Sequence, residues 1–168
     1  DKLSSIESVI GTAFLDILQP GVNGKAFGGG AKDTIFDSSG SEHLRGGFTE
    51  DRLMGDPGDG VADFFWVERF DEIVPSDIIT GLSQANGDKL AWNPAQFNLG
   101  DTVDFGEVAI NTFLGTFPQF LFNTGTGALV YDDDGLGPAP AELLASLIGV
   151  TTLSHGDFRA FTDAQFFA

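Results

Sequence analysis

Acidic side chains recur at a regular interval in the first third of the chain, in a pattern that suits cation binding. Asp33, Glu42 and Asp51 stand nine residues apart, and Asp16 lies nearly two intervals before Asp33. Carboxylates are the oxygen ligands that hard cations such as Ca²⁺ prefer. The chain of 168 residues has 25 acidic and 8 basic residues, a net charge of −17. This balance favours cations as partners and disfavours nucleic acid.

The acids belong to a nine-residue repeat that also spaces glycines and apolar residues. Its units read GTAFLDILQ, the shorter PGVNGKAF, GGGAKDTIF, DSSGSEHLR and GGFTEDRLM over residues 11–54, with a degenerate unit GDGVADFFW at 58–66. Glycines in the first six positions permit a tight turn, and the last three positions predict a short strand whose middle side chain points inward. Stacked units bury a continuous apolar stripe, which we expect to comprise Leu18, Phe27, Ile35, Leu44, Leu53 and Phe65.

The units GGGAKDTIF and GGFTEDRLM resemble the nonapeptide repeat of the repeats-in-toxin (RTX), or haemolysin-type, calcium-binding family. The opening DKLSSIESVIGTAFLDIL is similar to the lead-in to the first repeat of that family. The resemblance implies an all-β fold, in which a short, degenerate parallel β-roll (a nonapeptide solenoid) is followed by a β-rich C-terminal capping region. The expected division is a degenerate RTX β-roll over residues 1–66 and a cap with a type I secretion signal over residues 67–168.

The resemblance also implies where calcium binds, because successive turns of a β-roll lie on alternate edges and ions bind between turns two units apart. The first edge would contain the turns 11–16, 28–33 and 46–51. Its expected metal-site residues are the sixth-position acids and the first-position glycines, namely Asp16, Asp33, Asp51, Gly11, Gly28 and Gly46.

The second edge would contain the turns 20–25, 37–42 and 55–60, whose sixth positions are Lys25, Glu42 and Gly60. The ammonium group of Lys25 would occupy the place of the cation. We therefore expect little or no calcium on the second edge, and an ion pair between Lys25 and Glu42 in its place.

Departures from the repeat weaken the prediction for the first edge. Phe14, Ala31 and Thr49 occupy the fourth position, where the pattern has glycine. A non-glycine residue with a positive φ angle costs about 1 kcal/mol. The alternative is a repeat array that keeps its fold and binds no metal.

Residues after the repeats predict further strands. Residues 117–134 alternate Phe120 and Phe122 with Leu129 and Tyr131 around a Gly-rich turn, which predicts a β-hairpin. Residues 141–148 suit a helix by propensity, but the resemblance favours a strand, which we expect. The tail from residue 153 resembles the C-terminal signal that type I secretion machinery recognises; a docked strand with a frayed end is compatible with that interpretation.

A second calcium loop is suggested by Asp132 and Asp134, which belong to an Asp-Asp-Asp-Gly sequence after the hairpin. The twelve-residue EF-hand pattern is not met, because prolines interrupt it and Leu143 stands where the bidentate glutamate belongs. The alternative is a solvated acidic turn.

The chain shows no catalytic constellation, so we expect no enzyme activity. It has no cysteine, and it lacks the Gly-x-Ser-x-Gly elbow, the His-Glu-x-x-His zinc helix and the phosphate loop. His43 and His155 are expected at the surface and in a local cap. Asp56-Pro57 resembles self-cleavage sites of secreted modules, but we interpret it as an ordinary turn. No apolar run reaches the roughly 20 residues of a membrane span.

Together these features predict a secreted bacterial protein, extracellular or at the cell surface, that folds when it meets extracellular calcium. The expected role is a structural or adhesive component of the surface or matrix, with self-association or cell-surface glycans as further partners; the 17 phenylalanines favour an assembly interface. The chain begins with Asp, which suggests a piece of a longer protein. The alternative role is therefore the C-terminal export-and-folding domain of a larger secreted enzyme, a protease or lipase.

Overall fold

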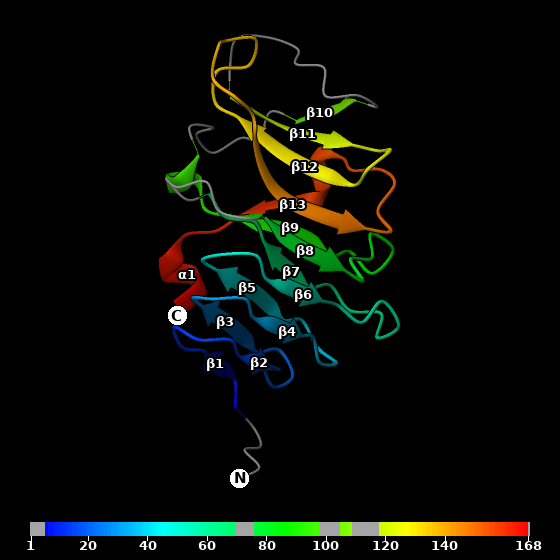
Figure 1. Ribbon diagram of the computed structural model, residues 1–168. Coiled ribbons are helices and arrows are strands. Elements are labelled where there is room, and N and C mark those ends of the chain that lie inside the picture. The colour runs from blue at the N-terminus through cyan, green and yellow to red at the C-terminus, as the bar shows by residue number, and fades with distance from the viewer. Residues whose placement is uncertain (1–5, 70–75, 98–104, 109–117, 168) are drawn as a thin grey trace.

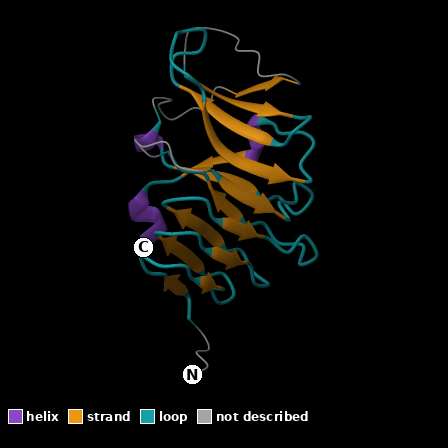
Figure 2. Ribbon diagram, viewed as in Figure 1, coloured by secondary structure: helices purple, strands orange, loops and turns teal. Residues whose placement is uncertain are grey.

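The computed structural model describes residues 6–69, 76–97, 105–108 and 118–167 (Figure 1). Strands dominate these residues (Figure 2). Within them, helix is limited to α1 (Asp163–Phe167) and two 3₁₀ turns, η1 (Pro94–Gln96) and η2 (His155–Asp157). The strands form two sheets that share one core.

The first sheet is parallel at every described pair and has the strand order β1-β3-β5-β7-β9-β14. Its strands are β1 (Ser8–Ile10), β3 (Lys25–Gly29), β5 (His43–Gly47), β7 (Phe64–Trp66), β9 (Lys89–Trp92) and β14 (Phe158–Ala160). The short strands follow from the repeat, because its six-residue turns leave only a few residues between them.

The second sheet has the order β10-β11-β12-β13-β8-β6-β4-β2 and is mixed. The pairs from β13 to β2 and the pair β10–β11 are parallel, whereas β11–β12 and β12–β13 are antiparallel. Its strands are β2 (Ile17–Leu18), β4 (Thr34–Phe36), β6 (Arg52–Met54), β8 (Asp77–Thr80), β10 (Phe105–Val108), β11 (Gln119–Asn123), β12 (Ala128–Asp132) and β13 (Glu142–Ile148). Consecutive strands from β1 to β9 alternate between the two sheets, so both sheets rise together along the molecule (Figure 1).

The expected fold class, an all-β chain with a short β-roll solenoid followed by a capping region, is wrong. No closed solenoid forms among the described residues, and the second sheet is mixed. Strands β8, β9, β13 and β14, which all follow residue 66, continue the same two sheets. The reason is that Ile79 and Leu90 stay in register with the apolar residues of the repeats after the nine-residue period has ended. The domain division at residue 66 stays a prediction.

The core lies between the two sheets and is largely the predicted stripe. Ile35, Leu44, Leu53 and Phe65 are fully buried, which confirms that part of the prediction, and Leu18 packs partly buried against them. The prediction is wrong for Phe27, because Ala26 pairs with Leu44 and is the buried residue. The short unit 20–27 lacks a residue in its turn rather than in its strand, which moves Phe27 to the other face of the sheet.

The hairpin and the strand predicted after the repeats are confirmed. Strands β11 and β12 pair antiparallel, with Phe120 opposite Tyr131 and Phe122 opposite Leu129. All four side chains are buried. The segment of ambiguous propensity forms strand β13, because its apolar residues cover the same core.

The C-terminal tail packs on the outer face of the first sheet, beside β3 and β5 (Figure 1). Arg45 holds it there with a side chain that is 8% exposed. Its guanidinium donates to Glu68 at 2.6 Å and to Asp163 of α1 at 2.9 Å, and it lies over the rings of Phe27, Trp66, Phe166 and Phe167. The tail therefore forms a docked strand and helix in the folded chain.

We predict that Arg45→Met lowers the free energy of unfolding by about 3–5 kcal/mol, because it leaves the buried carboxylate of Glu68 without its ion-pair partner. Asp163→Asn removes only the half-exposed partner and should cost about 1 kcal/mol or less. Urea unfolding measures both values. A smaller loss for Arg45→Met than for Asp163→Asn would contradict this account.

His43 lies beneath the same tail rather than on the free surface predicted for it. Its ring stacks on Phe64 with centroids 4.4 Å apart, and the Trp66 indole N–H donates to His43 Nδ1 at 3.3 Å. Burial, helped by the charge of Lys25, lowers the pKa of His43 to about 4. The folded protein therefore favours the neutral ring.

We predict a loss of stability that is due to His43 as the pH falls from about 6.5, its ordinary pKa, to about 4. Over this range His43 binds a proton in the unfolded chain but not in the folded chain, so a lower pH favours unfolding. Melting temperatures at pH 7 and pH 4.5 should differ less in His43→Phe than in the parent. An unchanged difference in His43→Phe would contradict this account.

Candidate metal centre

Asp16, Asp33 and Asp51 lie in a row along the expected first edge, and Asp77 continues the row. Each of the first three directly precedes a strand of the second sheet, and Asp77 begins β8. The backbone N–H of each acid donates to Oδ1 of the next: Asp16 to Asp33 at 2.7 Å, Asp33 to Asp51 at 2.7 Å, and Asp51 to Asp77 at 2.9 Å. We call these four residues the first-edge ladder.

The middle of the first-edge ladder has oxygens without partners. Oδ2 of Asp33 and Oδ2 of Asp51 are buried and accept no hydrogen bond. No ion pair in the described part of the chain includes Asp33, Asp51 or Asp77. Burial raises the pKa of Asp33, that of Asp51 to about 7, and that of Asp77 well above its usual range. A bound cation would therefore relieve a real electrostatic cost.

The predicted glycines lie against these carboxylates. A Cβ atom at Gly28 would collide with Asp33 Oδ2 and lie 2.5 Å from the Gly46 carbonyl oxygen, and one at Gly46 would lie 2.5 Å from Asp51 Oδ2. Gly11 has the same relation to Asp16 Oδ2, at 2.8 Å. Carboxylate and carbonyl oxygens thus lie so close to these three glycines that no side chain fits there. The six predicted first-edge residues therefore lie together.

The Asp16 end of the ladder is closed by local hydrogen bonds. Asp16 Oδ2 accepts from the backbone N–H of Thr12 at 2.6 Å and from its hydroxyl at 2.9 Å. The unpaired oxygens of Asp33 and Asp51 therefore make the turns 28–33 and 46–51 the better candidate for an ion.

The strain expected at the fourth position occurs in two of three turns. Ala31 and Thr49 have φ angles of 68° and 86°. Phe14 does not have a positive φ, because its turn closes differently: its backbone N–H donates to Thr12 Oγ1 at 3.1 Å. The prediction is confirmed for Ala31 and Thr49 and wrong for Phe14.

We predict that Thr49→Gly raises the free energy of unfolding by about 0.5–1 kcal/mol. Relief of the left-handed backbone exceeds the entropy that glycine adds to the unfolded chain, and the hydroxyl that is lost is buried without a partner. Thr34→Gly, in the extended strand β4, is the matched control and should be destabilising. Chemical denaturation would contradict the prediction if both variants lost stability alike.

On the second edge, the structure corrects which residues are aligned. Asp63 rather than Gly60 lies next to Glu42, whose N–H donates to Asp63 Oδ1 at 2.9 Å, and the Asp63 N–H donates to Asp88 Oδ1 at 3.1 Å. The expected pair of Lys25 and Glu42 does not form among the described residues; Lys25 Nζ donates to the Gln165 carbonyl at 3.3 Å. The reason is again the short unit, which places Lys25 in strand β3.

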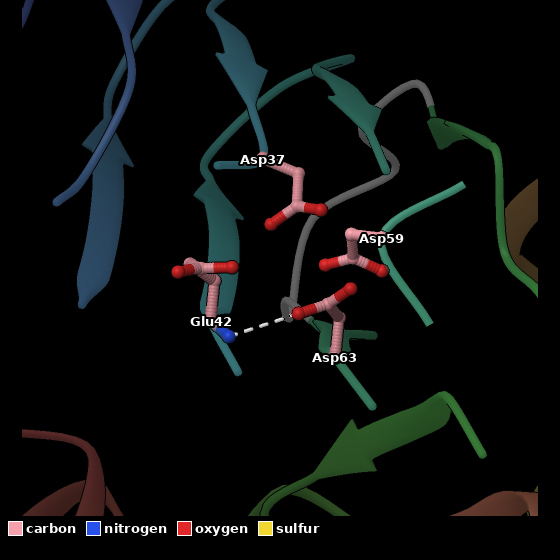
Figure 3. A group of neighbouring side chains, drawn as sticks. All are labelled: Asp37, Glu42, Asp59 and Asp63. Atoms are coloured by element: carbon pink, nitrogen blue, oxygen red, sulfur yellow. Dashed lines mark hydrogen bonds between the residues drawn. The ribbon is translucent and has the colours of Figure 1, made fainter. Parts of the chain in front are cut away.

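Four carboxylates converge on this edge: Asp37, Glu42, Asp59 and Asp63 (Figure 3). Each offers one oxygen, and these four oxygens lie within 4.8 Å of one another. We call them the second-edge cluster. Asp37 and Glu42 bound the turn between β4 and β5, and Asp59 and Asp63 come from the loop between β6 and β7. Burial and the neighbouring carboxylate of Glu42 raise the pKa of Asp37 to about 8, and burial raises that of Asp63 to about 7.

Sequence reasoning missed the second-edge cluster, although one signal was present. The unit GDGVADFFW has Asp63 at its own sixth position, so continuing the repeat through the irregular residues 55–57 would have placed Asp63 beside Glu42. Nothing in the repeat pattern indicates Asp37 or Asp59, which stand where the repeat has glycine.

The third predicted group, Asp132 and Asp134, also lies together, with Asp133 between them. Asp132 Oδ1 caps the turn by accepting from the N–H groups of Asp134 and Gly135. Arg69 donates to Asp133 at 3.2 Å and to Glu142 at 2.9 Å, which supplies a positive charge at this turn. The turn is not the solvated one of the alternative, because Asp132 is buried and Asp134 Oδ1 is buried without a hydrogen-bond partner. Calcium binding at this turn stays a prediction.

Comparison with known proteins identifies no family. No protein-family model matches the chain, and a search of curated proteins finds no significant match. The resemblance to RTX repeats therefore rests on the repeat residues alone. None of the helices in the described part of the chain has the length and apolar character needed to span a membrane.

Proposed function

We propose that this chain is a calcium-binding module of a secreted protein, in which Ca²⁺ bound at the first edge stabilises the fold. One observation carries the proposal: Asp33 and Asp51 are 1% and 0% exposed, and each has a buried Oδ2 without a hydrogen-bond partner beside the turn glycines. Backbone carbonyl and carboxylate oxygens are the ligand set that Ca²⁺ takes.

The coupling between ion and fold follows from charge. Without a cation, burial and then the neighbouring carboxylates raise the pKa values of Asp33, Asp51 and Asp77, and the net charge of −17 opposes compaction. An ion that binds only the folded chain stabilises it by RT ln(1 + [Ca²⁺]/Kd), about 2.7 kcal/mol at a hundredfold excess over Kd. Extracellular calcium then favours the folded state, and a calcium-poor compartment disfavours it.

We propose a structural role rather than a catalytic one. Four of these acids lie at the starts of strands, where each accepts a hydrogen bond from a neighbouring turn: Asp33, Asp51, Asp63 and Asp77. Such contacts connect one turn to the next. A metal bound between turns would reinforce this connection.

We predict that calcium raises the melting temperature of the EDTA-treated chain by roughly 5–10 °C at a hundredfold excess over Kd. Asp51→Asn should lose most of this gain, because it removes a charged ligand at the centre of the site. Glu50→Gln is the matched control, since Glu50 is the adjacent acid and pairs with the exposed Lys32. It should keep the gain. Circular dichroism measures each melting temperature with calcium and with EDTA.

Two results would argue against the proposal. If the parent melts at one temperature with calcium and with EDTA, the first edge binds no stabilising ion. If Asp51→Asn gains as much as Glu50→Gln, calcium acts elsewhere on the chain.

A further inference from the structure

We propose that the second-edge cluster, made of Asp37, Glu42, Asp59 and Asp63, binds a divalent cation of its own, with Ca²⁺ preferred. This is the edge where the sequence predicts little or no calcium. The inference rests on side chains that the first-edge site does not use, so each site can exist without the other.

The spacing of the four carboxylates suits one calcium ion. Their four oxygens lie within 4.8 Å of one another. Oxygens on opposite sides of a bound Ca²⁺ are about 4.6–5.2 Å apart, because Ca–O distances are 2.3–2.6 Å. Figure 3 shows the carboxylates directed at a common space from two neighbouring loops.

The strongest evidence is a buried carboxylate oxygen with nothing to bind. Asp37 is 6% exposed, and its Oδ1 has no hydrogen-bond partner, although the carboxylate is directed toward the other three (Figure 3). Its Oδ2 accepts from the Asp56 N–H at 3.1 Å, which fixes its orientation. A buried polar oxygen left unpaired is costly, and a cation in the cluster would satisfy it.

Asp59 repeats this arrangement from the second loop. Its Oδ1 accepts from the Val61 N–H at 3.0 Å, and its Oδ2 is buried without a partner. Each loop therefore holds one aspartate by one oxygen and leaves the other oxygen free within the cluster. Such orientation before binding lowers the entropic cost of assembling a site.

Charge and geometry indicate the kind of ion. No lysine or arginine in the described residues forms an ion pair with the second-edge cluster, so none of these basic residues neutralises its negative charge. Mg²⁺ demands near-octahedral geometry at 2.0–2.1 Å and keeps several waters. Two loops fixed by backbone hydrogen bonds suit the larger and more adaptable Ca²⁺ better.

Isothermal titration of the metal-free full chain with CaCl₂ tests the proposal. We expect Asp59→Asn and Asp37→Asn each to lose one bound ion per chain or to weaken one site at least tenfold. Asp56→Asn is the matched control: Asp56 is an exposed acid of the same loop and lies outside the cluster. It should bind as the parent does. Melting in EDTA shows whether each variant is folded; we expect no loss, because asparagine removes a repelling charge.

A parallel titration of Asp33→Asn separates the two edges. Retention of one calcium ion in Asp33→Asn, and its loss in Asp59→Asn, supports the second-edge site whatever the first edge does. Parent-like stoichiometry and affinity in both Asp37→Asn and Asp59→Asn overturn it, even if Asp33→Asn loses an ion.

A measurement on the parent alone guards against misfolded variants. Amide NMR shifts on adding CaCl₂ should include residues 37–42 and 55–63. Shifts confined to residues 28–33 and 46–51 would overturn the second-edge site and leave the first-edge proposal intact.

Discussion

The hydrogen bond from a backbone N–H to the carboxylate of the next turn on the same edge is the contact on which the stacking of turns depends. It occurs along the first edge from Asp16 to Asp77 and along the second from Glu42 to Asp88. Turns with few apolar residues have little hydrophobic surface to hold them in register. A charge-assisted hydrogen bond fixes the distance between successive turns, and the parallel strands that follow keep the same register.

This contact has an energetic cost, which is a buried carboxylate oxygen without a hydrogen-bond partner. A carboxylate that replaces a backbone acceptor brings a second oxygen with it, and in Asp33, Asp51 and Asp37 an oxygen remains buried and unpaired. The hydrogen bonds that align the turns therefore also produce the electrostatic cost that a cation would relieve. Arg45 relieves a similar cost on the outer face of the first sheet, where it pairs with buried Glu68.

The sequence could predict the local features and not the long-range pairing. The nine-residue period located the buried residues Ile35, Leu44, Leu53 and Phe65, as well as the aligned Asp33 and Asp51, because each repeats the same turn and strand. The prediction from the period failed where a unit is irregular. Ala26, not Phe27, lies in the core, and Asp63, not Gly60, lies beside Glu42 on the second edge. The pairing of β13 with β8 and of β14 with β9 depends on contacts between residues roughly 70 apart, which no local pattern encodes.

The hydrogen bonds that join the acids directly preceding the strands run in one direction along the chain. In each of them the N–H belongs to the earlier turn and the accepting carboxylate to the later one, as with Asp16 and Asp33 or Glu42 and Asp63. The bond from the Asp56 N–H to Asp37, which does not precede a strand, runs the other way. During synthesis, the most recently emerged turn therefore lacks its acceptor until the following turn on the same edge leaves the ribosome. Each turn thus waits for about 17–26 further residues, so a partly made row of turns always ends in a turn whose N–H still lacks its carboxylate acceptor.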